Sequence, residues 1–313
     1  MILTIFDLHC DTLSEMLIRG VGVRNNNLAV DLDKTKGFDN VCLTFAAYIS
    51  DRFENKCAYN HYKKLKSTFK NNVLSDCVVN AQNARQVEDI WNDGKIAALF
   101  SVENAKVIGN DLSILDELKR DNVLFITLTH NADNLLASGV GGSEGDLTEF
   151  GKSAIIKMNE LGILPDLSHL NERGFYSVAE ISEAPLLLTH SNLKAVKDNK
   201  RNLTNDQFKR VVKSGGVVGI NFYCEFLGND PFESIYRNIS LMLDLGGEEN
   251  IALGSDFDGA RISNQLASID KLNDLCNYLI GKNLSQRNLE KIFYKNALRI
   301  IGERKNELQF NKK

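Results

Sequence analysis

The hydrophobic positions of this chain fall into short apolar runs that alternate with longer amphipathic stretches. Runs rich in β-branched and aromatic residues predict strands, and apolar residues spaced three or four apart predict helices. We expect eight strands, at about residues 2–9, 39–48, 95–102, 122–129, 163–168, 185–190, 215–222 and 250–256. Helical patterns lie near residues 58–77, 84–92, 111–119, 147–161, 172–182, 204–213, 231–245, 266–281 and 285–301.

This alternation indicates the fold class. The runs 41–47 and 96–100 are apolar on both faces, as expected of parallel strands that are covered by helices. Eight such strands can close into a barrel, and 313 residues are an ordinary length for one α/β barrel with insertions. We therefore predict an α/β protein of the (β/α)8 TIM-barrel type, with residues 1–313 forming a single domain.

Four of the five histidines stand at the ends of predicted strands: His9, His130, His169 and His190. In a (β/α)8 barrel these strand ends meet at one mouth, and imidazole is a common metal ligand. Each histidine taken alone fits equally well a ring that is satisfied by a backbone carbonyl. The fifth, His61, lies in a polar helical segment, where we expect a solvated surface residue.

Two acidic residues extend this candidate ligand set. Asp11 follows His9 by two positions, and strand alternation predicts that both share one face while Leu8 and Cys10 point toward the helices. Glu103 ends a buried run, where an unpaired carboxylate would be costly. Its two oxygens could bridge two ions, as binuclear hydrolytic sites require. The whole set therefore favours a metal site over separate coincidences.

The eighth predicted strand ends in the segment 254–259, which contains two aspartates between glycines. In a metal-hydrolase barrel, an aspartate at this place can move a proton from the nucleophile to the leaving amine. We assign this role to Asp256. The glycines indicate that the strand has begun to turn, so Asp258 is left as a supporting residue or a contact for the substrate amine.

Composition limits the partners. The net charge of −4, with both signs interspersed, provides no basic surface for nucleic acid or an anionic membrane. We find no apolar stretch near the roughly 20 residues of a membrane span, and no secretory signal. The six cysteines lack CxxC pairs, which argues against disulfides and thiolate metal sites. We expect a cytoplasmic protein that binds a small polar molecule, with a homodimer left open.

Two connecting segments carry separate expectations. Residues 51–70 are charged and partly helical, and we expect them to pass over the mouth of the barrel. The glycine-rich segment 138–145 lacks the lysine and the Ser/Thr of a P-loop, so we interpret it as a mobile loop after the fourth strand.

Several motifs, in order along the chain, resemble the membrane (renal) dipeptidase family of metallopeptidases, in its bacterial cytoplasmic type. They are residues 7–12, 102–103, 127–134, 166–169, 189–191, 201–203, 219–223 and 254–259, with 295–300 similar to the family's last helix. The resemblance implies an amidohydrolase-like barrel and a zinc-dependent dipeptidase. One departure is Asn104, which stands where family members commonly have glycine and leaves the geometry of that turn open.

By this resemblance, five residues would hold two zinc ions. His9 and Asp11 would bind one ion, His169 and His190 the other, and Glu103 both. Two cations would lower the pKa of a shared water enough to supply a bridging hydroxide near neutral pH, and would polarise the peptide carbonyl. Imidazole and carboxylate ligands also suit other divalent metals.

The same resemblance implies roles toward the substrate for four residues. His130 would contact the carbonyl oxygen as it becomes negative, and Asp256 would transfer protons. Arg201 and Tyr223 would contact the substrate carboxylate or its surroundings, because a guanidinium can make two parallel hydrogen bonds to a carboxylate. Arg201 could instead be one cation in the exposed run 197–201.

The substrate predicted in this way is a dipeptide with a free C-terminal carboxylate. One alternative is another binuclear amidohydrolase, which would act on an N-acyl amino acid, a lactam or a lactone. A second is an inactive barrel that binds ligands with the help of metal. The presence of Asp256 and His130 beside all five ligands argues against this second alternative.

Overall fold

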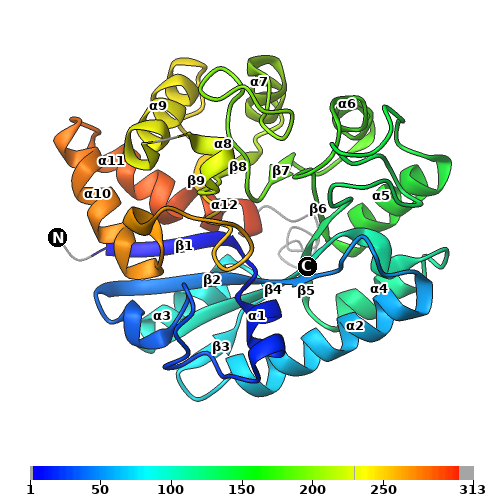
Figure 1. Ribbon diagram of the computed structural model, residues 1–313, viewed down its shortest axis with the longest axis horizontal. Helices are drawn as coiled ribbons and strands as arrows, with labels where there is room; N and C mark the ends of the chain where they lie inside the picture. Colours follow the sequence, from blue (N-terminus) through cyan, green and yellow to red (C-terminus); the bar gives the residue numbers. More distant parts are fainter. Residues whose placement is uncertain (1–2, 229, 303–313) are drawn as a thin grey trace, which may run out of the picture.

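The computed structural model, which describes residues 3–228 and 230–302, has parallel strands at its centre and helices around them (Figure 1). Eight strands follow one another in the order β2-β1-β9-β8-β7-β6-β5-β4, and pairing of β2 with β4 closes the ring. The predicted (β/α)8 TIM barrel is confirmed.

All eight predicted strands are present, most of them shorter at their ends. The strands are β1 (Leu3–Cys10), β2 (Phe38–Tyr48), β3 (Val78–Asn80), β4 (Ile96–Glu103), β5 (Val123–Thr127), β6 (Leu164–Asp166), β7 (Leu187–Leu188), β8 (Val217–Ile220) and β9 (Ile251–Leu253). The short β3 was not predicted. It pairs with the first residues of β4, where β5 has not yet begun, and so it lies outside the ring.

Helices cover the ring, and most follow the predicted pattern. They are α1 (Thr12–Arg19), α2 (Asn55–Thr68), α3 (Ala84–Asn92), α4 (Ile114–Arg120), α5 (Glu149–Leu161), α6 (Glu172–Ile181), α7 (Asn205–Lys213), α8 (Cys224–Leu227), α9 (Pro231–Asp244), α10 (Leu272–Gly281), α11 (Gln286–Glu290) and α12 (Asn296–Gly302). The last predicted helix is divided by a π-helical turn at Lys291–Lys295. The prediction missed α1 and α8, which are short and follow motif residues directly.

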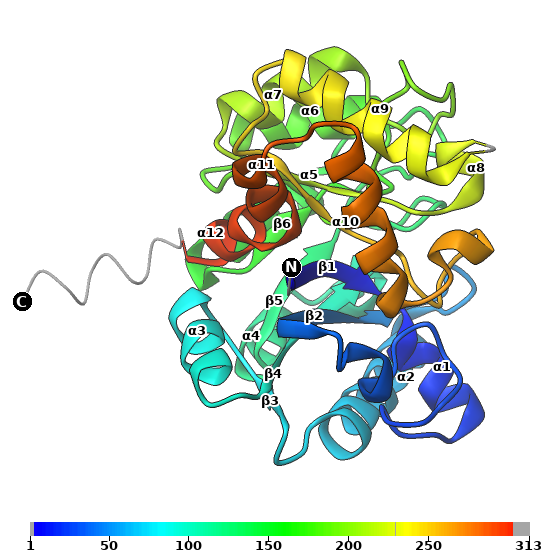
Figure 2. The same ribbon diagram turned by 90° about the vertical axis from the view of Figure 1, so that its left-hand side faces the viewer.

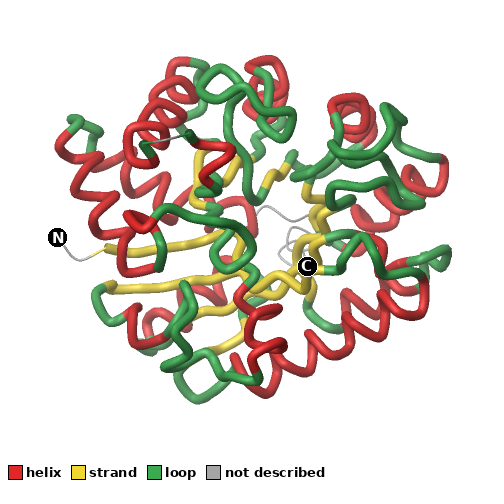
Figure 3. Tube along the Cα trace, in the orientation of Figure 1, coloured by secondary structure: helices red, strands yellow, loops and turns green. Residues whose placement is uncertain are grey.

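The two ends of the barrel differ. Apolar strand residues such as Phe6, Leu99 and Phe125 form one cluster with residues of α3 and α12, including Ile300. Figure 2 shows α3 and α12 at one end of the molecule, with α1 and α8 at the other. Long loops connect β5 to α5 and β7 to α7 (Figure 3). The apolar end is therefore closed by helices, while the carboxyl ends of the strands open toward loops.

The segment between β2 and β3 does not cross the mouth as a whole. Tyr62 of α2 is buried and stacks on Phe100 of β4, with ring centroids 6.1 Å apart, so α2 covers the outside of the barrel. Only the turn that precedes α2 reaches the mouth, through Asp51. The amphipathic pattern of residues 55–68 is thus that of an ordinary barrel helix. None of the helices in the described part of the chain is both long and apolar enough to cross a bilayer.

Candidate metal centre and active site

A cluster of buried histidines and acidic residues lies at the carboxyl ends of the strands. His9 is the penultimate residue of β1 and Glu103 is the last residue of β4. His169 and His190 stand three and two residues beyond the ends of β6 and β7. All four side chains are nearly inaccessible to solvent. The structure therefore brings together residues that are up to 181 positions apart in the sequence, between His9 and His190.

Glu103 lies near the Nε2 atoms of three histidines. Its Oε1 is 3.1 Å from Nε2 of His169 and 3.7 Å from Nε2 of His190. Its Oε2 is 3.7 Å from Nε2 of His9, whose ring centroid is 3.9 Å from that of His190. The two oxygens are therefore nearest to different imidazoles, which suits a carboxylate shared by two ions.

Asp11 and Asp256 complete the group around His9. Nε2 of His9 is 3.3 Å from Oδ2 of Asp11, and ligand atoms of His9, Asp11 and Asp256 all lie within 4.8 Å of one another. The proximity of Asp11 has a different origin from the one predicted. β1 ends at Cys10 and its register with β2 shifts after Asp7, so Asp11 reaches His9 as the residue that precedes α1 rather than by strand alternation.

His169 and His190 converge on one point. Their Nε2 atoms are 2.8 Å apart, and burial lowers the pKa of both imidazoles well below the ordinary value. The Nδ1 atoms of both rings form hydrogen bonds to other side chains. Nδ1 of His169 lies 3.0 Å from Oδ1 of Asn131, and Nδ1 of His190 lies 2.8 Å from Oγ1 of Thr189. Such outer contacts orient a ring and leave Nε2 available as a ligand.

The electrostatics of this cluster call for a cation. Burial, reinforced by the charge of Asp11, raises the pKa of Glu103 well above its ordinary value and that of Asp256 to about 6. Burial alone would lower the pKa of His9, but attraction by Glu103 and Asp11 raises it to about 10. Asp11 Oδ1 is buried and makes no hydrogen bond within the described residues. Nitrogen and oxygen donors with an unused buried carboxylate oxygen fit zinc or a similar divalent ion.

His130 belongs to the same mouth but to a more open part of it. β5 ends at Thr127, so His130 lies in the following loop, with 21% of its side chain exposed. Its Nδ1 is 2.7 Å from Oδ2 of Asp51, and its ring centroid is 4.6 Å from that of His169. His130 is therefore placed beside the cluster and held by a carboxylate of its own.

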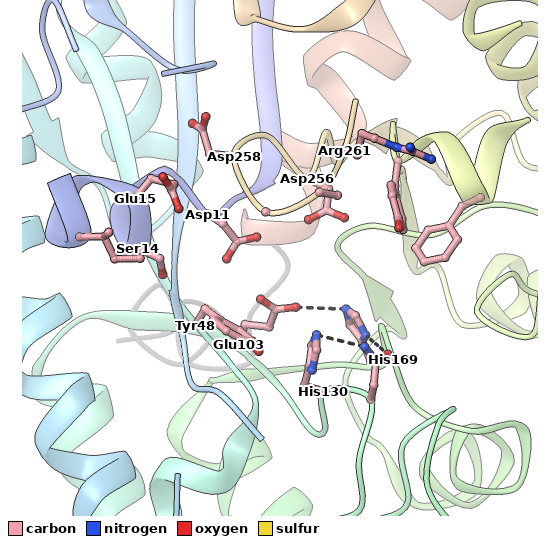
Figure 4. A pocket seen from close by; sticks show the side chains of 16 residues that line it. Asp11, Ser14, Glu15, Tyr48, Glu103, His130, His169, Asp256, Asp258 and Arg261 are labelled. Carbon is pink, nitrogen blue, oxygen red and sulfur yellow. Dashed lines mark hydrogen bonds and ion pairs between the residues drawn. The ribbon is translucent and has the colours of Figure 1, made fainter. Parts of the chain in front are cut away.

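The cluster forms the floor of a pocket of about 550 Å³. Figure 4 shows the side chains of Glu103, His130 and His169 on one side of it, with Asp11 and Asp256 opposite them. The remaining lining residues include Ser14, Glu15, Ile18, Tyr48, Asn131, Tyr223, Phe226, Asp258 and Arg261. A volume of this size accepts a small ligand rather than an extended polymer.

Tyr223 lines this pocket, whereas Arg201 is buried near it. Arg201 donates from Nη1 to Oγ of Ser191 at 2.8 Å and from Nη2 to the carbonyl of His190 at 2.9 Å. Its guanidinium lies over the ring of Phe226, a pocket residue, at 5.8 Å. With 5% exposure, Arg201 is not a solvated cation of the run 197–201. Its Nε makes no hydrogen bond within the described residues.

Asp258 is turned away from the cluster in Figure 4. Its carboxylate accepts hydrogen bonds from Oγ1 of Thr12 at 2.5 Å and from the amide of Ala29 at 2.8 Å. Both Asp256 and Asp258 have positive φ angles, of 62° and 67°. The turn predicted from the glycines therefore separates the two aspartates, and Asp258 joins the start of α1 to the loop before β2.

One prediction about another segment is corrected. His61 is half-buried, with its ring centroid 4.7 Å from that of Phe53, because the apolar face of α2 extends to its first turns. The segment 138–145 forms a loop that is bonded to its neighbours, since the amide of Val140 donates to the carbonyl of His169 at 2.9 Å, and its mobility stays a prediction. A Cβ atom on Gly139 would lie 2.5 Å from the carbonyl oxygen of His130, so close packing explains this glycine.

Three site residues escaped the sequence analysis. Asp51 pairs with His130, Asn221 donates to Oδ2 of Asp256 at 3.0 Å, and Asp166 accepts from Oγ1 of Thr189 at 2.6 Å. A signal was available for Asp51, a charged residue two positions after the apolar run that ends at Ile49. Asp166 and Asn221 lie inside the motifs that carry the family resemblance, and that position was the available signal for both residues.

Comparisons with known proteins indicate a family. The family model described as membrane dipeptidase (peptidase family M19) matches residues 2–312. A protein of Schizosaccharomyces pombe named as an uncharacterized dipeptidase is 33% identical over 221 residues, which cover 67% of this chain and 53% of that relative. This chain therefore spans about half the length of that relative.

Two solved structures share the fold over nearly the whole chain. One is a metallopeptidase from Rhodobacter sphaeroides liganded with a phosphinate mimic of the dipeptide L-Ala-D-Ala, with 25% identity and a TM-score of 0.91. The other is a structure described as dipeptidase AC of family M19, with 26% identity and a TM-score of 0.91. Each alignment covers 97% of this chain and 99% of the other protein.

Proposed function

Because this chain belongs to the membrane dipeptidase family, peptidase family M19, we propose that it is a metal-dependent dipeptidase. Its substrates are dipeptides with a free C-terminal carboxylate. The observation that carries this proposal is the position of Glu103, whose two carboxylate oxygens are nearest to different imidazoles at the floor of a pocket. A pocket of about 550 Å³ suits a ligand of two residues.

The residues present fit a pair of zinc ions. In this proposal His9 and Asp11 would hold one ion, His169 and His190 would hold the other, and Glu103 would be shared between them. The unused buried oxygen of Asp11 and the short distance between the two Nε2 atoms support this ligand set. When bound, two such ions supply an activated water and polarise the scissile carbonyl.

The proton transfers fall to Asp256. Asn221 donates to its Oδ2, so Oδ1 is the atom that would accept a proton from the attacking water and return it to the departing amine. In the metal-free protein, burial and the charge of Asp11 raise the pKa of Asp256 to about 6, so this carboxyl group holds a proton more readily than an exposed aspartate does.

Three residues orient the substrate. His130 contacts the carbonyl oxygen as negative charge develops on it. The buried Arg201, whose Nε is without a partner among the described residues, attracts the terminal carboxylate, and Tyr223 forms the adjoining pocket wall. A free carboxylate at the end of the substrate then limits the length of peptide that the pocket accepts.

Three further features of the protein are part of this proposal. Residues 1–313 form a single catalytic domain, the protein works in the cytoplasm, and the dipeptide is its small-molecule partner. A homodimer stays a prediction.

The test is hydrolysis by the zinc-loaded protein of a dipeptide panel compared with N-acyl amino acids, lactams and lactones. We expect cleavage of dipeptides and at least tenfold lower kcat/KM, or about 1.4 kcal/mol, for the corresponding dipeptide amides. Preferred cleavage of N-acyl amino acids, lactams or lactones would favour the amidohydrolase alternative. Binding of two equivalents of metal without any cleavage would favour a binding protein.

A further inference from the structure

Asp51 and His130 form a carboxylate–imidazole pair beside the proposed metal ligands. The Asp51 side chain is 26% exposed and its Oδ2 lies 2.7 Å from Nδ1 of His130. The ring of Tyr48 stands edge-on to His130 at 5.1 Å between centroids. Because an ionised carboxylate only accepts hydrogen bonds, this contact places a proton on Nδ1. Nε2 is then the other ring atom; it lies 3.3 Å from Nδ2 of Asn131, and a substrate would contact it in place of that amide.

Asp51 is itself held on both sides. Its Oδ1 accepts from Nδ2 of Asn104 at 3.0 Å, and its backbone carbonyl accepts from Nζ of Lys106 at 2.7 Å. Its Oδ2 also accepts from the amide of Ala132 at 3.3 Å. A carboxylate with this many fixed donors has little freedom to rotate, so it can hold the imidazole in one orientation.

Asn104 connects this pair to Glu103, its neighbour in the chain. Asn104 is fully buried with φ of 78°, a conformation in which glycine or asparagine is favoured. Its amide group donates to the carbonyl of Ile49 at 2.9 Å as well as to Asp51, and its Oδ1 accepts from Asn134 at 3.1 Å. The side chain thus does what a glycine at this position could not do, because it ties the ends of β2 and β4 to the loop that follows β5.

We propose that Asp51, supported by Asn104, is a positioning residue that fixes the orientation and the tautomer of His130. This inference rests on the proposed function, because the His130 contact with the reacting carbonyl belongs to that function. A ring held through Nδ1 can turn only Nε2 toward the oxygen that becomes negative, so the hydrogen bond to Asp51 sets the direction of that contact. The predicted gain therefore arises in the transition state and affects kcat rather than KM.

A purely structural role for Asp51 makes a different prediction. Since Asp51 also accepts from Ala132, its loss could simply loosen the loop that carries His130. Loosening the loop would also disturb pocket residues that follow His130, and it would change activity whether or not the imidazole is present. The two roles are separated by removing Asp51 in the presence and in the absence of the His130 ring.

The experiment is a double-mutant cycle of Asp51→Ala and His130→Ala in the zinc-loaded protein. The readouts are kcat, KM and the affinity for a phosphinate dipeptide mimic, whose tetrahedral phosphorus resembles the transition state. We expect Asp51→Ala to lower kcat and phosphinate affinity by about 10- to 100-fold with KM changed less than about threefold. In the His130→Ala background, the same substitution should change phosphinate affinity by less than about threefold.

Two further variants sharpen the cycle. Asp51→Asn should restore part of the lost kcat, because an amide oxygen can still accept from Nδ1. Asn104→Gly keeps a residue that tolerates the positive φ and removes the side-chain contacts, so its loss of kcat should lie between the wild type and Asp51→Ala. Glu54→Ala is the matched control: Glu54 is another acidic residue bonded to Lys106, 73% exposed, and should leave kcat unchanged.

A spectroscopic measurement tests the role of Asp51 independently of whether the protein hydrolyses dipeptides. In ¹⁵N spectra of the histidine rings, the wild type should show His130 with a proton on Nδ1, and Asp51→Ala should lose that preference. This result is measurable even if no dipeptide is cleaved. Equal losses of phosphinate affinity with and without the His130 ring, a change confined to KM, or an unchanged His130 spectrum in Asp51→Ala would each overturn the proposal.

Discussion

The two sides of the barrel mouth use the same chemical groups in opposite ways. On the buried side, Glu103 is 4% exposed and its Oε1 lies 3.1 Å from His169. On the open side, Asp51 lies 2.7 Å from His130. Burial raises the pKa of both carboxyl groups, but only at Asp51 do the hydrogen bond and charge of His130 outweigh it and lower the pKa below the ordinary value.

The difference teaches what each pair needs. The Asp51 and His130 side chains compensate each other and are complete as a hydrogen-bonded pair. Glu103 lies near Asp11 and Asp256, and the two imidazoles nearest its Oε1 have lowered pKa values. Buried negative charge without enough positive charge is costly in protein interiors. The buried side is therefore suited to a bound cation, whereas the open side can orient a group toward the substrate without one.

The largest expected effect is a difference in metal content between the two sides. Glu103→Gln should lose one or both metal ions and at least about 10³-fold in kcat/KM, because the bridging ligand contributes several kcal/mol of charge stabilisation through the metals. Asp51→Ala should keep full metal content. Elemental analysis of both variants after dialysis measures this. Unchanged metal stoichiometry in Glu103→Gln would remove the bridging assignment.

A second test concerns the stability of the metal-free protein. The pKa of Asp256 is about 6 in the folded protein, above its ordinary value of 3.8, so its ionisation destabilises the folded state. This penalty is complete above pH 6 and disappears as the pH falls toward 4. Metal-free Asp256→Asn should therefore be more stable than wild type at pH 8, by up to about 3 kcal/mol, with no advantage at pH 4.

Urea unfolding of the two metal-free proteins at several pH values measures this difference. The low-pH arm serves as the internal control, because both side chains are neutral there. If the variant were less stable than wild type at pH 8, the hydrogen bond from Asn221 would have to outweigh the burial of the charge, and our account of the buried side would be wrong.

The smallest expected effect concerns the contribution of Arg201, which is buried next to the cluster, to binding of the substrate carboxylate. Arg201→Lys keeps a positive charge but loses the planar donors that contact Ser191 and the carbonyl of His190. We expect KM for dipeptides to rise about tenfold, roughly 1.4 kcal/mol, with kcat little changed. Dipeptide amides provide the control, since they lack the carboxylate and should discriminate little between the two proteins. An equal rise in KM for the amides would contradict the carboxylate role.

Much of the fold could be predicted from local patterns. Apolar runs marked all eight strands of the ring, because a parallel strand that is buried on both faces must be apolar along its length. Histidines at the ends of those runs marked the mouth, because parallel strands in a barrel all end on the same side. The π-helical turn at Lys291–Lys295 and the short β3 left no such periodic signal.

The sequence by itself determined the barrel, the end of it that carries the site and the residue types available there. The tertiary structure alone decided which of them meet: Asp51 reaches His130 across 79 positions, and Asp258 turns to Thr12 across 246. The physical reason is that hydrophobic periodicity ends with the strand. Beyond it, side-chain direction depends on loop conformations, such as the positive φ of His169 and Asp256, that only packing against neighbouring loops can hold.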